Sequence, residues 1–152
     1  MAVPRAMRRL LRIRGMEEEQ RQAALESALG DLSRLEAALA AVQARERRGR
    51  RLVTASAETG EFMDRIAGLE EMRAGRRHAA ALTPRIAEAE LAVTARRREF
   101  LAKRVERRQV ESLIQKAEVN EAVQAGRRAQ GELDGWFLSR APRRGGADGG
   151  AR

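Results

Sequence analysis

Apolar side chains recur at steps of three and four residues through the first half of the chain. One such seam consists of Leu25, Leu29, Leu32, Leu35, Leu39 and Val42. This spacing puts the side chains on one face of an α-helix, and a face this narrow is typical of a coiled coil. Pro4 is a favourable residue at the start of a helix. The pattern therefore predicts a first helix over about residues 5–54.

The same period returns in the second half of the chain and predicts a second helix over about residues 61–139. Its apolar seam includes Phe62, Ile66, Leu69, Leu82, Ile86, Ala89, Val93 and Phe100. Pro84 lies inside this helix, where proline removes a backbone donor and clashes with the preceding turn. We therefore expect a kink near Pro84, or a helix that restarts there with Thr83 as its cap.

The turn between the two helices has two candidate positions. Small, hydroxyl-bearing and glycine residues cluster over residues 54–60, which predicts a turn at about residues 55–60. The alternative is a turn at residues 82–84, with the first helix running on to Leu82. We favour the earlier position.

A turn near residue 58 leaves the end of the second helix without an intramolecular partner. An antiparallel pair would then place Arg5 opposite Glu111, and the residues from about Ser112 to Ser139 would project as a single helix roughly 40 Å long. A lone helix gains no tertiary burial, yet this one carries Leu113, Ile114, Val119, Val123, Leu133, Trp136, Phe137 and Leu138.

The predicted fold class is therefore all-α. We expect an elongated antiparallel two-helix coiled-coil hairpin with a projecting C-terminal helix over residues 1–140. Residues 141–152 are rich in glycine and arginine, which predicts a disordered basic tail.

Composition narrows the classes of function. Aromatic residues make up 3% of the chain, so we expect no deep pocket. The absence of cysteine excludes disulfides and thiolate metal sites. No apolar run is long enough for a transmembrane helix. His78 stands among arginines without other ligands nearby, and no phosphate-binding loop or hydrolase motif occurs. We expect no enzyme, no metal and no cofactor.

The formal net charge of +9 comes almost wholly from arginine, because lysine occurs only at Lys103 and Lys116. Such a charge suits nucleic acid, a membrane surface or an acidic protein. Glutamates alternate with the arginines, however, and aromatic stacking groups are scarce, so we expect no nucleic acid. A basic coiled coil that binds nucleic acid, or a structural homodimer, is the alternative function.

Several segments together resemble the FliJ/YscO family of bacterial flagellar and type III secretion export. A short basic, apolar start (Met7–Arg14) precedes an acidic, glutamine-containing stretch (Glu17–Leu25). Val110-Glu111-Ser112-Leu113 resembles the "l-E-x-L" step of that family, and the stretch Arg127–Asp134 resembles its "R-x-x-Q-x-x-L-D-E" ending. The likeness covers about residues 5–140. Gly135 departs from it, because the family usually has an acidic residue there.

The resemblance implies a stalk-like helical protein of the export apparatus that assists protein export and flagellum assembly. Its partners would be the hexameric export ATPase, the cytoplasmic domain of the export gate and export chaperones. It would be cytoplasmic, peripheral at the cytoplasmic face of the inner membrane through the export apparatus. The sequence leaves open whether it serves a flagellum or an injectisome.

Two groups of residues are the candidate binding sites. For the ATPase we select cations that pair with carboxylates and apolar anchors on the projecting helix, namely Arg127, Arg128, Leu133, Asp134, Trp136 and Phe137. For the gate or a chaperone we select a patch near the hairpin tip, namely Phe62, Ile66 and Leu69. The alternative for these three is that they belong to the coiled-coil seam.

Overall fold

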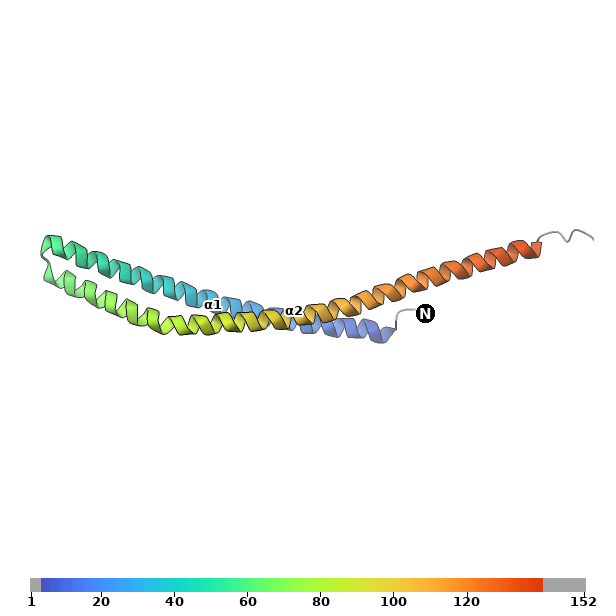
Figure 1. Ribbon diagram of the computed structural model, residues 1–152, viewed down its shortest axis with the longest axis horizontal. Helices are drawn as coiled ribbons and strands as arrows, with labels where there is room; N and C mark the ends of the chain where they lie inside the picture. The colour runs from blue at the N-terminus through green and yellow to red at the C-terminus, as the bar shows by residue number, and fades with distance from the viewer. Residues whose placement is uncertain (1–3, 141–152) are drawn as a thin grey trace, which may run out of the picture. The chain divides into compact units, whose positions relative to one another are not determined.

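The structure is a computed structural model that describes residues 4–140. These residues form two long α-helices. They are α1 (Arg5–Thr59) and α2 (Phe62–Arg140), shown in Figure 1. The contacts divide the chain into two units: Arg12–Arg107, here called the hairpin unit, and a terminal unit with described residues 4–11 and 108–140. The fold is all-α, as predicted, with two long helices packed against each other.

In the hairpin unit the two helices lie side by side and antiparallel (Figure 1). Half-buried or buried side chains follow a heptad pattern on both helices: Leu25, Leu32, Leu35, Leu39 and Val42 on α1, and Leu82, Ile86, Ala89, Val93 and Phe100 on α2. A two-helix layer has only one interface, so no large side chain among the described residues becomes fully buried. The seam predicted from the spacing forms the core of this unit except at Leu29, Phe62, Ile66 and Leu69, which are exposed.

Near the tip of the hairpin the two backbones approach closely at glycines. A Cβ atom added to Gly49 would lie 2.6 Å from the carbonyl oxygen of Gly68, and one added to Gly68 would lie 2.6 Å from the carbonyl oxygen of Gly49. The backbones also lie close at Gly75, where an added Cβ atom would lie 3.1 Å from the Cβ of Glu46. These glycines permit a helix–helix distance that any larger residue would prevent.

The chain reverses at Gly60 and Glu61, so α1 continues about one turn past the predicted boundary near residue 54. The hydroxyl groups that suggested a turn instead donate to carbonyl groups inside the helix: Thr54 to Arg50, Ser56 to Val53 and Thr59 to Ala55. Gly60 then adopts a φ of +76°, and its N–H donates to the carbonyl of Ser56 at 2.9 Å. A glycine in this conformation is a common helix C-cap.

Pro84 does not end α2, which continues through it. The side chain is exposed, and so is Ala80, whose carbonyl loses its usual donor because proline has no N–H. Thr83 does not cap a new helix, since its hydroxyl donates to the carbonyl of Ala79 at 2.9 Å. Leu82 and Ile86, on either side of Pro84, are half-buried in the seam, so the seam continues across the proline.

In the terminal unit the first turns of α1 pack against α2. Val110 and Ile114 are buried, and Met7, Leu11 and Ala117 pack around them. The predicted projecting segment therefore begins after Ala117 and not at about Ser112, because the turn lies later in the chain than residue 58. The predicted tail, residues 141–152, lies outside the described residues.

Candidate functional site

The end of α2 presents a long exposed surface. From Glu118 to Arg140 every residue is exposed except Glu121, which is intermediate. The large apolar side chains here keep much of their surface in water: Leu133 is 54% exposed, Trp136 49% and Phe137 65%. Apolar side chains gathered on one exposed helix are typical of a binding surface for a partner.

Trp136 is held in place by its neighbours on α2. Its ring meets that of Phe137 edge to face, with centroids 5.2 Å apart and an interplanar angle of 83°. The guanidinium carbon of Arg140 lies 4.4 Å from the centroid of the Trp136 ring, which is a cation–π contact. Beside Trp136, a shallow depression is lined by Ala129, Glu132, Leu133 and Trp136. The predicted anchors Leu133 and Trp136 thus share one face.

The predicted charged residues of the same segment have only local contacts. Arg128 donates from Nε to the carbonyl of Gln124 at 3.4 Å, and Gln130 donates from Nε2 to Oδ1 of Asp134 at 3.2 Å. Within residues 4–140 no carboxylate forms an ion pair with Arg127 or Arg128. Neither guanidinium group is therefore engaged by a carboxylate among the described residues, although Arg128 donates to the Gln124 carbonyl.

The three residues predicted at the hairpin tip lie on the first turns of α2. Phe62 is 70% exposed, and Ile66 and Leu69 are exposed to smaller extents. The buried positions of α2 in this region are instead Gly68 and Gly75. Met63, which the sequence reasoning did not select, is 75% exposed and enlarges the apolar surface. Its position beside Phe62 was the available signal.

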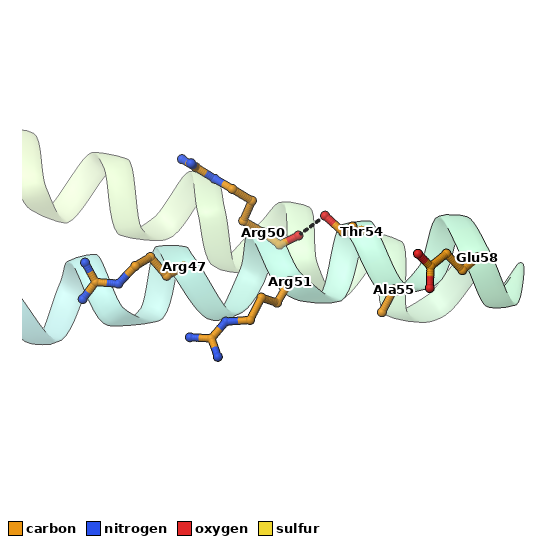
Figure 2. A pocket seen from close by; sticks show the side chains of 6 residues that line it. All are labelled: Arg47, Arg50, Arg51, Thr54, Ala55 and Glu58. Carbon is orange, nitrogen blue, oxygen red and sulfur yellow. Dashed lines mark hydrogen bonds between the residues drawn. The ribbon is translucent and has the colours of Figure 1, made fainter.

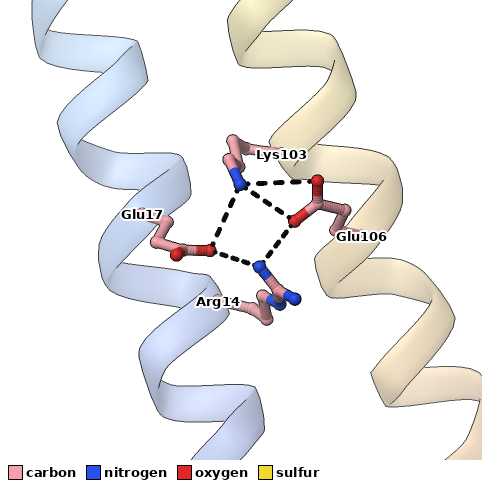
Figure 3. Close-up of polar contacts among 4 residues, drawn as sticks. All are labelled: Arg14, Glu17, Lys103 and Glu106. Carbon is pink, nitrogen blue, oxygen red and sulfur yellow. Dashed lines mark hydrogen bonds and ion pairs between the residues drawn. The ribbon is translucent and has the colours of Figure 1, made fainter.

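The opposite end of the hairpin unit contains a polar network that joins the two helices (Figure 3). Nη1 of Arg14 lies 2.8 Å from Oε2 of Glu17 and 2.7 Å from Oε2 of Glu106. Nζ of Lys103 lies 3.1 Å from Oε2 of Glu106 and 3.6 Å from Oε2 of Glu17. The hydrogen bond from Arg14 lowers the pKa of Glu17, and the same bond raises the pKa of Arg14.

Further ion pairs join α1 to α2 along the hairpin unit. Arg45 binds Glu71 through two hydrogen bonds, which lowers the pKa of that carboxyl. Other arginines pair across the helices in the same way: Arg21 with Glu99, Arg76 with Glu46 and Arg107 with Glu18. These five arginines, Arg14, Arg21, Arg45, Arg76 and Arg107, therefore pair with glutamates of the other helix.

A basic depression on α1 near the tip is lined by Arg47, Arg50, Arg51, Thr54, Ala55 and Glu58. Figure 2 shows that the three guanidinium groups point in different directions and do not converge on one point. Arg50 is also paired with Glu46 at 3.2 Å. This arrangement does not build a site for a single anion.

Residues 4–140 contain neither a cluster of metal ligands nor a helix that could span a membrane. No set of three or more histidine or acidic side chains is placed to hold a metal ion. Neither helix has a stretch apolar enough, over sufficient length, to cross a membrane.

The comparisons with known proteins agree with the resemblance in the sequence. A family model described as "Flagellar FliJ protein" matches residues 4–146, which include both helices. No curated protein and no solved structure matches the chain significantly.

Proposed function

Because this chain belongs to the FliJ family of flagellar proteins, which are components of the flagellar export apparatus, we propose that the end of α2 binds the hexameric export ATPase. The observation that carries the proposal is the exposure of Leu133, Trp136 and Phe137 on a helical segment that α1 does not cover. Tryptophan and arginine dominate the energetics of protein interfaces. The stalk-like segment 118–140 supplies both.

The charges of the segment fit the same partner. Arg127 and Arg128 have no carboxylate partner within residues 4–140. Guanidinium groups bind carboxylates in a bidentate manner, so acidic loops that line an ATPase ring would be suitable partners. The carboxylate of Asp134 accepts a hydrogen bond from Gln130 and so is held beside the apolar anchors.

The test is the rate of ATP hydrolysis by the cognate export ATPase with and without this protein. The protein should raise the rate or the hexamer population. A double variant, Leu133→Ala with Trp136→Ala, should lose that effect without a change in helix content measured by circular dichroism. Leu138→Ala is the matched control, because Leu138 lies about 140° around the helix from Leu133 and is also exposed. Stimulation that survives the double substitution would place the contact elsewhere.

The exposed apolar patch at the hairpin tip is the proposed contact for the cytoplasmic domain of the export gate or an export chaperone. Phe62 and Met63 are its most exposed members. Phe62→Ala should weaken binding of the purified gate domain or chaperone in a calorimetric titration. Leu91→Ala, which truncates an equally exposed side chain elsewhere on α2, should leave binding unchanged. Equal losses in both variants would refute a contact localised at the tip.

These contacts would hold the protein at the export apparatus, on the cytoplasmic face of the inner membrane. There it would assist protein export and flagellum assembly. In this role the protein acts through binding and carries out no chemical step itself.

A further inference from the structure

One face of α2 carries an apolar stripe that α1 does not touch. Its members follow steps of three and four residues: Val119, Ala122, Gly126, Ala129, Leu133 and Trp136. All six residues are exposed, and a Cβ atom added to Gly126 would meet nothing within 4 Å. Steps of this kind form the seam of a coiled coil. The stripe therefore has the spacing of a coiled-coil face, and no helix among residues 4–140 covers it.

This stripe is distinct from the surface that packs against α1. The α1 contacts are made by Val110, Ile114 and Ala117, which form a different row of α2. At 100° per residue, Val119 lies about 140° around the helix from Ile114. The first turns of α1 therefore do not cover the stripe.

The sizes of the side chains make the stripe complementary to itself. A two-fold axis between Arg127 and Arg128 places a second copy antiparallel to the first. Val119 then faces Trp136 of that copy, Ala122 faces Leu133, and Gly126 faces Ala129. Each large side chain meets a smaller one, so the seam interdigitates. A parallel pair would instead set Trp136 against Trp136 and Gly126 against Gly126, which fits less well.

The charges beside the stripe are compatible with this pairing. None of the six residues is charged, although charged residues make up 35% of the chain. The residues that directly precede alternate seam positions line one side of the seam on both copies. In the antiparallel arrangement Glu132 on this side lies beside Ala125 of the second copy, and Glu118 lies beside Ser139. No carboxylate meets another across the seam.

We propose that, in the absence of another partner, two copies of this chain pair antiparallel through this stripe. From Val119 to Trp136 the contact is about 26 Å long at 1.5 Å per residue. A pair of helices in contact over that length buries on the order of 1000 Å² in total, at the lower limit for specific interfaces. The dimer is accordingly weak and reversible. Pairing covers Leu133 and Trp136, so the dimer does not bind the ATPase through them.

Sedimentation equilibrium of the isolated full chain tests the pairing, with no ATPase present. The wild-type protein should show a monomer–dimer equilibrium. Ala129→Glu, which buries a charge opposite Gly126 of the second copy, should weaken it by at least about tenfold, since an unpaired buried charge is costly. Gln124→Glu adds the same charge on the opposite side of the helix and should have no effect. A protein that remains monomeric at the highest soluble concentration, or equal losses in both variants, overturns the proposal.

The orientation is tested with single cysteines, because the natural chain has none. Ala122→Cys and Leu133→Cys variants are oxidised separately and as an equal mixture. Antiparallel pairing predicts that the mixture forms mainly the disulfide between the two variants. Disulfides that join each variant to itself would show a parallel pair and overturn the arrangement. Failure of this dimer leaves the proposed ATPase contact intact, because that contact is measured by ATP hydrolysis.

Discussion

Replacing Gly49 with alanine is the sharpest test of the hairpin packing. The new Cβ would lie 2.6 Å from the carbonyl oxygen of Gly68 and 3.0 Å from the backbone N of Met72. Backbone atoms cannot move aside by changing rotamer, so one helix must shift. Overpacking of this kind costs about 1–3 kcal/mol, whereas alanine in place of glycine favours a helix by about 1 kcal/mol. The net expectation is a loss of stability of about 1 kcal/mol.

Gly30 provides the matched control, because a Cβ atom added there meets nothing within 4 Å. Gly30→Ala should therefore stabilise the protein by about 1 kcal/mol, the difference in helix propensity. For a chain of this length, 1 kcal/mol corresponds to a shift of roughly 2–4 °C in Tm. The two variants should shift Tm in opposite directions when unfolding is followed by circular dichroism. Equal stabilisation by both substitutions would refute the close approach of the helices.

Three further predictions concern stability. The lowered pKa values of Glu17 and Glu71 stabilise the fold above the ordinary glutamate pKa of 4.5. This contribution is lost as the pH falls through the lower folded-state values, so urea midpoints should drop with acidification, and less steeply in Glu17→Gln. Gly60→Ala strains a positive φ and should lower Tm, since a left-handed conformation costs alanine about 1–2 kcal/mol. Ile114→Ala should speed hydrogen exchange at the start of α1, including Met7, while the hairpin unit keeps its rates.

Each of these expectations has a clear contrary outcome. A urea midpoint that does not change between neutral pH and pH values below about 4 would remove the role assigned to the Arg14–Glu17 and Arg45–Glu71 pairs. Unchanged exchange in Ile114→Ala would show that the first turns of α1 are held by other contacts. For Gly60, an alanine variant with wild-type Tm would contradict the assigned turn.

Much of the fold follows from the spacing of apolar residues. The seam from Leu25 to Val42 and that from Leu82 to Phe100 indicate two amphipathic helices, because only helical geometry collects these positions on one face. The ion pairs were foreseen only as a general property of alternating Arg and Glu. Their particular partners, such as Arg45 with Glu71, depend on the register between the helices, which the spacing does not determine.

Local features were harder to predict because their signals are ambiguous. Threonine is common in turns, yet the hydroxyls of Thr54 and Thr59 each donate a hydrogen bond to a backbone carbonyl one turn earlier, and both residues remain in the helix. In the sequence, Gly49 is only a glycine inside a helical pattern, which lowers helix propensity. Its role depends on Gly68, which lies far along the chain and faces it only once the turn is set at Gly60.

The candidate binding residues were predicted from a combination of pattern and resemblance. Trp136 and Leu133 stood out because they are large apolar residues at the end of a helix without a partner. The arrangement of Trp136 against Phe137 and Arg140 could not be inferred, since side-chain rotamers are not encoded in the spacing. Whether these residues bind the ATPase stays a prediction.

Hydrogen–deuterium exchange of this protein with and without the hexameric export ATPase tests the central claim most directly. At protein concentrations below those at which two copies pair, residues 118–140 of the free chain should exchange rapidly, because a helix without tertiary contacts opens easily. Adding the hexamer should slow exchange strongly in residues 118–140 and leave the centre of the hairpin unit unchanged. Protection confined to the hairpin unit, or no protection of the segment that contains Leu133 and Trp136, would contradict the account.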